Sequence, residues 1–117
     1  MAAPNIVNVA TITGKTATVA LSSTNATAVV SNAASSNKVF KINNILVSNV
    51  DATNAADITI NIYSQDDIAG TAYAIASTIS VPADSTLIVL DKNTALYLEE
   101  DKSIGAVASA ADDLVVV

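Results

Sequence analysis

The sequence contains no cysteine, histidine, tryptophan or arginine, and it has only two prolines and three glycines. Without cysteine or histidine the chain has no thiolate nucleophile, no imidazole base and no Ser-His-Asp triad, and it lacks the usual ligands of zinc, haem and iron–sulfur sites. Without arginine it has no bidentate phosphate clamp, and its five lysines form no run, so we expect no binding to nucleic acid. These absences predict a protein that is not an enzyme and that carries no cofactor.

The net charge and the apolar content limit the classes of protein to which this chain can belong. Eleven acidic residues against five lysines give a formal net charge of -6, while hydrophobic residues make up 51% of the 117 positions. That fraction is too high for a disordered chain, and the length fits one domain. Because the apolar residues are mostly valine, isoleucine, leucine and alanine, we expect a thin core that is stabilised by oligomerisation. The longest stretch without charge, residues 16–37, is rich in threonine, serine and asparagine, which predicts no membrane span.

Apolar and polar residues alternate along much of the chain. Ile58, Ile60 and Ile62 are separated by polar residues, which is the two-residue period of a half-buried strand. The abundant valine, isoleucine and threonine suit a pleated sheet because they are branched at Cβ. We therefore predict an all-β protein, an antiparallel β-sandwich of jelly-roll-like form. The expected strands are Ile6–Ile12, Thr16–Ser22, Ala26–Val30, Lys38–Val50, Ile58–Tyr63, Tyr73–Val81, Thr86–Leu90, Ala95–Leu98, Ile104–Ala108 and Leu114–Val117.

The chain divides by composition into two parts of one domain. Residues 1–37 are the more polar part, and we expect them to form an N-terminal arm or hairpin with strands packed on the same domain. Residues 38–117 are expected to form the β-sandwich core. Within Lys38–Val50 the apolar positions change face at Asn43-Asn44, which predicts a bulge or bend that lets one strand serve both sheets.

Two predicted strands are apolar on both faces. In a domain this small, such a strand either meets another chain or is covered by flanking loops, and the sequence leaves both alternatives open. Under the first alternative the N-terminal arm reaches a neighbouring subunit. The residues expected at subunit contacts are Leu87, Ile88, Val89 and Leu90, then Leu114, Val115, Val116 and Val117, and in the arm Ile6, Val7 and Val9.

Acidic residues gather at Asp66-Asp67, Glu99–Asp101 and Asp112-Asp113, all in predicted turns. There they are expected to be solvated, to cap turns and to oppose aggregation. The segment Asp51–Asp57 offers oxygen ligands for calcium, but it lacks the glycine and the terminal glutamate of an EF-hand loop. We therefore predict no metal site, no catalytic residue and no cofactor-binding residue.

The segment Val39–Val50, followed by a polar turn and Ile58–Tyr63, resembles small β-sandwich virion proteins of tailed bacteriophages, especially those of cyanobacteria. Ile79–Lys92 and the turn Tyr97–Ile104 fit the same pattern, so the resemblance covers residues 38–117. It implies a jelly-roll-like subunit, most simply a capsid decoration or cement protein that binds the major capsid protein. Such a protein is expected to be a homo-oligomer, a trimer or dimer, to be assembled in the host cytoplasm, and to lie on the capsid exterior, away from nucleic acid and membrane.

Two alternatives to a decoration protein follow from the same features. One is an accessory structural protein of the phage tail or neck. The other is a carbohydrate-binding module on the same β-sandwich scaffold, in which Tyr63, Tyr73 or Tyr97 contacts the sugar.

Overall fold

The computed structural model describes residues 14–91, 93 and 96–117, and these residues form ten β-strands. The strands are β1 Val19–Ala20, β2 Thr27–Asn32, β3 Phe40–Ile42, β4 Ile45–Asn49, β5 Ala56–Tyr63, β6 Ala72–Val81, β7 Thr86–Leu90, β8 Leu96–Leu98, β9 Lys102–Ala108 and β10 Leu114–Val116. Among the same residues there is no helix of the length and apolarity that crossing a membrane requires.

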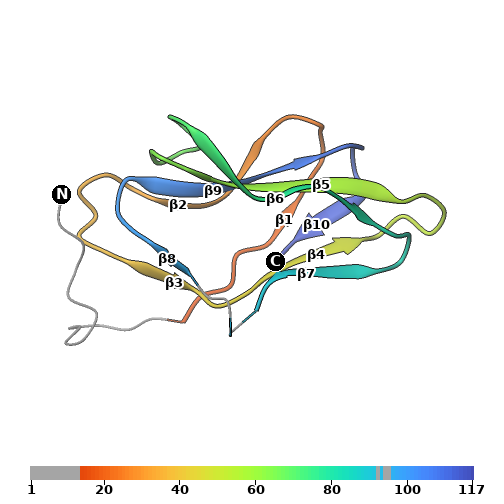
Figure 1. Ribbon diagram of the computed structural model, residues 1–117, viewed down its shortest axis with the longest axis horizontal. Helices are drawn as coiled ribbons and strands as arrows, with labels where there is room; N and C mark the ends of the chain where they lie inside the picture. Colours follow the sequence, from red (N-terminus) through yellow and green to blue (C-terminus); the bar gives the residue numbers. More distant parts are fainter. Residues whose placement is uncertain (1–13, 92, 94–95) are drawn as a thin grey trace.

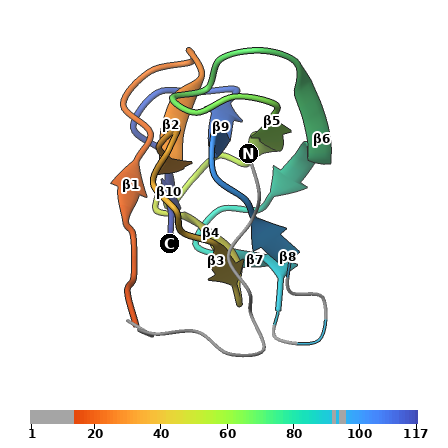
Figure 2. The same cartoon turned by 90° about the vertical axis from the view of Figure 1, so that its left-hand side faces the viewer.

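Most of the strands belong to two antiparallel sheets that face each other. Sheet A has the order β1-β10-β4-β7, sheet B has the order β2-β9-β5-β6, and β3 pairs with β8 in a separate ladder. Figure 1 shows sheet B as the upper layer and sheet A as the lower layer, with the ladder at one end. Figure 2 shows the molecule from that end. The predicted all-β antiparallel sandwich is therefore confirmed.

Alternation in the sequence located most strands to within a few residues. The expected Thr86–Leu90 coincides with β7, whereas the expected Lys38–Val50 is divided into β3 and β4 with the break at Asn43-Asn44. Because β3 pairs with β8 while β4 pairs with β10 and β7, this segment joins sheet A to the ladder rather than sheet A to sheet B. The expected strand Ile6–Ile12 lies outside the described residues.

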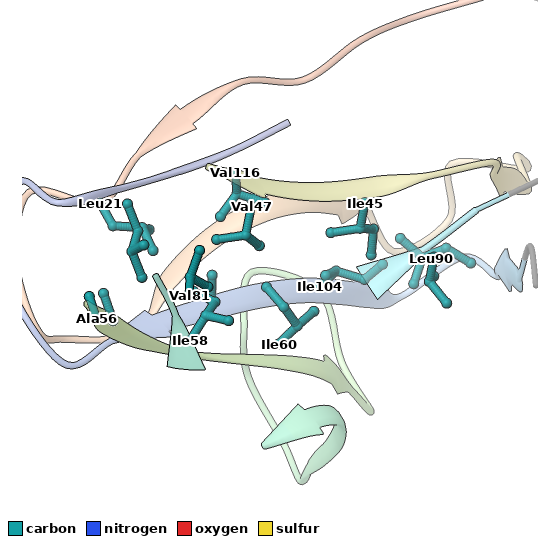
Figure 3. Close-up of a cluster of buried hydrophobic side chains, with 14 residues drawn as sticks. Leu21, Ile45, Val47, Ala56, Ile58, Ile60, Val81, Leu90, Ile104 and Val116 are labelled. Atoms are coloured by element: carbon teal, nitrogen blue, oxygen red, sulfur yellow. The ribbon is translucent and has the colours of Figure 1, made fainter. Parts of the chain in front are cut away.

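The core fills the space between the two sheets. In Figure 3, Val47 and Val116 from sheet A point toward Ile58 and Ile104 from sheet B, and all four side chains are buried. Leu21, which follows β1, is also wholly buried, so part of the segment 1–37 contributes to the same core. The core consists mainly of branched aliphatic side chains. Burial of each such side chain stabilises the folded state by roughly 1.5–3 kcal/mol.

The connection between β5 and β6 packs on the outer face of sheet B. A Cβ atom on Gly105, in β9, would lie 2.8 Å from Ile68 Cγ2 and 2.9 Å from Tyr63 Cε2, so only glycine lets these side chains reach the sheet. Ser103 fixes the connection, because its Oγ accepts from Ile68 N at 2.8 Å and donates to Gln65 O at 2.8 Å. Sheet B therefore has an outer face that the chain itself partly covers.

Candidate functional site

The outer face of sheet A is apolar and uncharged. None of the residues in its four strands carries a charge, whereas sheet B contains Asp57 and Lys102 and the ladder contains Lys41. Along β4, Ile45 and Val47 point into the core, so the alternation of a strand directs Leu46 outward. The outward residues of β10, β4 and β7, with Val50 beyond β4, are called here the uncharged face: Leu46, Ser48, Val50, Thr86, Ile88 and Val115.

Pairing between strands makes the uncharged face continuous. Val115 lies opposite Ser48, which lies opposite Thr86, and the hydroxyls of Ser48 and Thr86 are 3.2 Å apart. In the next row Leu46 lies opposite Ile88. Ile88 is 61% exposed and Val50 is 58% exposed, which are high values for large apolar side chains. The Ser48 and Thr86 hydroxyls share one hydrogen bond, and the other residues of the face present aliphatic carbon to their surroundings.

Strand β7 forms one of the two edges of sheet A. It occupies the last position in the order β1-β10-β4-β7, and its residues Thr86–Leu90 include neither a charge nor a proline, while one register shift at Val89 interrupts its pairing with β4. Soluble proteins commonly protect such edges with lysine, proline or a bulge, because unpaired backbone groups invite pairing with another chain. Strand β7 and the uncharged face therefore form one continuous surface without charge.

The predicted contact residues fall into three groups. In β7, Ile88 points outward, Leu87 and Val89 are half-buried, and Leu90 is buried in the core. At the C-terminus, β10 lies between β1 and β4 rather than at an edge. Leu114 and Val116 are therefore core residues, while Val115 belongs to the uncharged face and Val117 is half-buried beside Leu46. Ile6, Val7 and Val9 lie outside the described residues.

Four residues of the uncharged face are not among the contact residues expected from the sequence: Leu46, Ser48, Val50 and Thr86. The first three belong to the expected strand Lys38–Val50, in which the apolar positions change face at Asn43-Asn44. After that change the positions Leu46, Ser48 and Val50 share one face. Their spacing was a usable signal, but only the pairing of β4 with β10 and β7 shows that this face is the outer one.

The acidic clusters serve as turn residues. Asp67, Asp101 and Asp112 have positive φ angles of 56°, 59° and 65°, a backbone conformation that aspartate tolerates better than most residues. The Glu100 carboxylate accepts from Asn37 N at 2.8 Å. A hydrogen bond from Thr53 N–H holds the pKa of the Asp51 carboxyl below its ordinary value of 3.8. No group of three acidic residues converges among the described residues.

All three tyrosines are among the residues that line one hollow, called here the tyrosine pocket, and the rings of Tyr73 and Tyr97 are the exposed ones. Its volume is about 150 Å³, and it lies where the ends of β5 and β6 approach β8. Tyr73 is 61% exposed and Tyr97 is 47% exposed, whereas Tyr63 is buried. The pocket is lined by Ile62, Tyr63, Ser64, Tyr73, Tyr97, Glu99 and Lys102.

A larger cavity of about 320 Å³ opens between the sheets near the start of the described chain. Its walls combine core residues such as Val30 and Ile104 with Asn43, Asn44 and the lysines Lys15 and Lys41. The described lining offers these lysines and the hydroxyl of Thr16 but no carboxylate side chain, and these groups alone do not define a catalytic site.

Comparison with known proteins identifies no relative: the chain matches no protein-family model, no curated protein and no solved structure.

Proposed function

We propose that the protein is a structural subunit of a virus particle, a capsid decoration or cement protein that binds the major capsid protein and other copies of itself. The observation that carries this proposal is the uncharged face, together with the open edge of β7 beside it. A chain with a net charge of -6 that keeps one whole sheet free of charge has a surface suited to contact with protein. The function is adhesion rather than catalysis.

The winding of the chain supports a jelly-roll class. If β3 and β4 count as one bent strand, and β7 and β8 as another, eight strands remain. They visit the sheets in the order A, B, A, B, B, A, B, A, which is the path of two interleaved Greek keys. Jelly rolls of this kind occur in viral capsid domains and in lectins. The resemblance of residues 38–117 to phage virion proteins favours the first of these.

A decoration protein stabilises a capsid by linkage. A subunit that binds only the assembled lattice lowers the free energy of that lattice relative to its dissociated parts. The acidic character of the protein fits a place outside the shell, because like charges disfavour contact with the packaged nucleic acid. Protein contacts through the uncharged face supply the attraction.

Replacing Ile88 with lysine is expected to weaken self-association and capsid binding by roughly 100-fold, because burying an unpaired charge in an interface costs several kcal/mol. Sedimentation velocity should show that the wild-type protein is an oligomer and that the Ile88→Lys variant is a monomer. Ile79→Lys, the same change at an exposed position of β6 in sheet B, is the matched control and should leave the oligomer intact. A wild-type protein that stays monomeric and does not bind capsids would contradict the assignment of this surface.

Copy number separates a decoration protein from a tail or neck component. Quantitative mass spectrometry of purified virus particles is expected to find the protein in hundreds of copies per particle. A neck or tail component would be present in about six or twelve copies, set by the cyclic symmetry of those structures. Absence of the protein from purified particles would contradict both a decoration role and a tail or neck role.

A further inference from the structure

We propose that the tyrosine pocket binds a single pyranose ring, such as the terminal sugar of a glycan. This would be a second binding activity, separate from the protein contacts proposed above, because the pocket and the uncharged face have no residue in common. Both surfaces can therefore be occupied at the same time.

The aromatic rings of the pocket are presented to the solvent. Tyr73 comes from β6 and Tyr97 from β8, and these two side chains are among the most exposed large apolar residues of the described chain. Tyr73 pairs with Ile62 and shares its face of sheet B, whereas the ring of the neighbouring Tyr63 packs on the opposite, outer face against Gly105. A tyrosine ring ordinarily buries its apolar body and leaves only its hydroxyl in water. Two exposed rings beside one hollow provide the flat surfaces on which the C–H face of a sugar packs.

The charged groups of the pocket are available to a ligand. Glu99 and Lys102 both line the pocket, and neither side chain has a hydrogen bond or ion pair with another described residue. A carboxylate accepts hydrogen bonds and an ammonium group donates them, so the pair matches neighbouring hydroxyls that act as both donor and acceptor. A pyranose offers such hydroxyls at its edge and an apolar face to the rings.

The size and charge of the pocket narrow the class of ligand. At about 150 Å³ it is smaller than the roughly 300–1,000 Å³ of pockets that enclose a drug-sized molecule, so it accommodates one ring. The net charge of -6 and the Glu99 carboxylate disfavour nucleotides and other phosphate esters. A neutral, hydroxyl-rich ring fits these limits better than a peptide, which needs a longer groove.

The test is an NMR titration of the full-length protein with glucose, galactose, N-acetylglucosamine and their methyl glycosides, followed by a glycan array. At least one sugar is expected to shift the ring signals of Tyr73 and Tyr97 in a saturable manner, with a dissociation constant on the order of 1 mM. Tyr73→Ala and Tyr97→Ala should each weaken binding at least about tenfold. Tyr73→Phe keeps the ring and should retain most of the affinity.

Two controls separate loss of binding from loss of folding. Both substituted tyrosines are largely exposed, so the melting temperatures of the alanine variants should stay close to that of the wild type. Ile88→Ala, on the uncharged face, should bind sugar normally even where it weakens protein contacts. Absence of saturable shifts with every sugar, equal binding by Tyr73→Ala and Tyr97→Ala, or stronger binding of nucleotides or peptides than of sugars would overturn the proposal.

Discussion

A chain that ends at Asp113 is expected to lose the cooperative fold. The truncation removes β10, which pairs with β1 on one side and β4 on the other and so holds sheet A together. It removes the buried side chains of Leu114 and Val116, each worth roughly 1.5–3 kcal/mol. It also leaves β1 without a neighbour, since β1 pairs with β10 alone in sheet A.

The backbone loses as much as the core. Leu21 N donates to Leu114 O at 2.9 Å, and Leu46 and Val117 exchange hydrogen bonds of 3.0 and 2.9 Å. The backbone groups of Leu21, after β1, and of Leu46, in β4, would lose these partners beside a core opened to water. Small domains are stable by only about 5–15 kcal/mol, so the summed loss is of the size of the whole free energy of unfolding.

Circular dichroism and calorimetry should find no cooperative thermal transition in the truncated chain. Val115→Thr, which changes an outward side chain of the same strand and keeps its β-branched shape, is the matched control and should retain the transition. A truncated chain that melts cooperatively near the wild-type temperature would show that β10 is dispensable. Since the deletion removes fold and surface together, the docking role of the uncharged face is tested by point substitutions.

Sequence periodicity predicted the strands because one face of each is buried. Where a polar side chain is buried near the end of a strand, the alternation of apolar and polar residues no longer predicts where the strand begins. The expected strand Ile104–Ala108 omits Lys102 and Ser103, yet β9 begins at Lys102. Ser103 is wholly buried because its hydroxyl bonds to Gln65 and Ile68 of the β5–β6 connection. The sequence around a serine next to an acidic turn does not indicate that the serine has such hydrogen-bond partners.

Partners far apart along the chain could not be predicted from local pattern. Strand β2 pairs with β9 across about seventy intervening residues, and nothing in either segment specifies the other. The same limit applies to the sites. The sequence identified Leu87–Leu90 as apolar on both faces, but only the sheet order makes β7 an edge. Likewise, Tyr63, Tyr73 and Tyr97 form one pocket only after three strands have been brought together.

Two buried asparagines connect layers of the sandwich, and no pattern in the sequence indicated them. Asn49, at the end of β4, donates to Val81 O of β6 at 2.9 Å and to Asn54 O at 3.0 Å, and it accepts from Asp51 N at 2.9 Å. Asn32, at the end of β2, donates to Leu98 O of β8 at 3.0 Å. The connections that follow β2 and β4 lie at opposite ends of the molecule (Figure 1), so each asparagine ties one end of the layers together.

Replacing Asn49 with alanine is expected to lower the free energy of unfolding by about 3 kcal/mol, because it removes the side-chain donor to the buried Val81 carbonyl and also the side-chain partners of Asn54 O and Asp51 N–H. Urea unfolding followed by circular dichroism measures the change. Asn44→Ala, at an exposed position before the same strand, is the matched control and should shift the free energy by no more than about 0.5 kcal/mol. Equal effects of the two substitutions would show that Asn49 contributes no more than a surface residue.

Asn49→Asp tests the donor alone, because the two side chains have nearly the same shape. An ionised carboxylate would face the oxygens of Val81 and Asn54, to which Asn49 now donates, so this variant should be less stable than Asn49→Ala at neutral pH. Its protonated form can donate one hydrogen bond, so folding raises the pKa of the new carboxyl above the ordinary value of about 3.9. The loss of stability relative to the wild type is then largest at pH values above that raised pKa. It becomes smaller as the pH falls toward the ordinary pKa of aspartate. A deficit that did not change with pH would mean that the side chain at position 49 turns to water, and that the link between β4 and β6 does not need its amide.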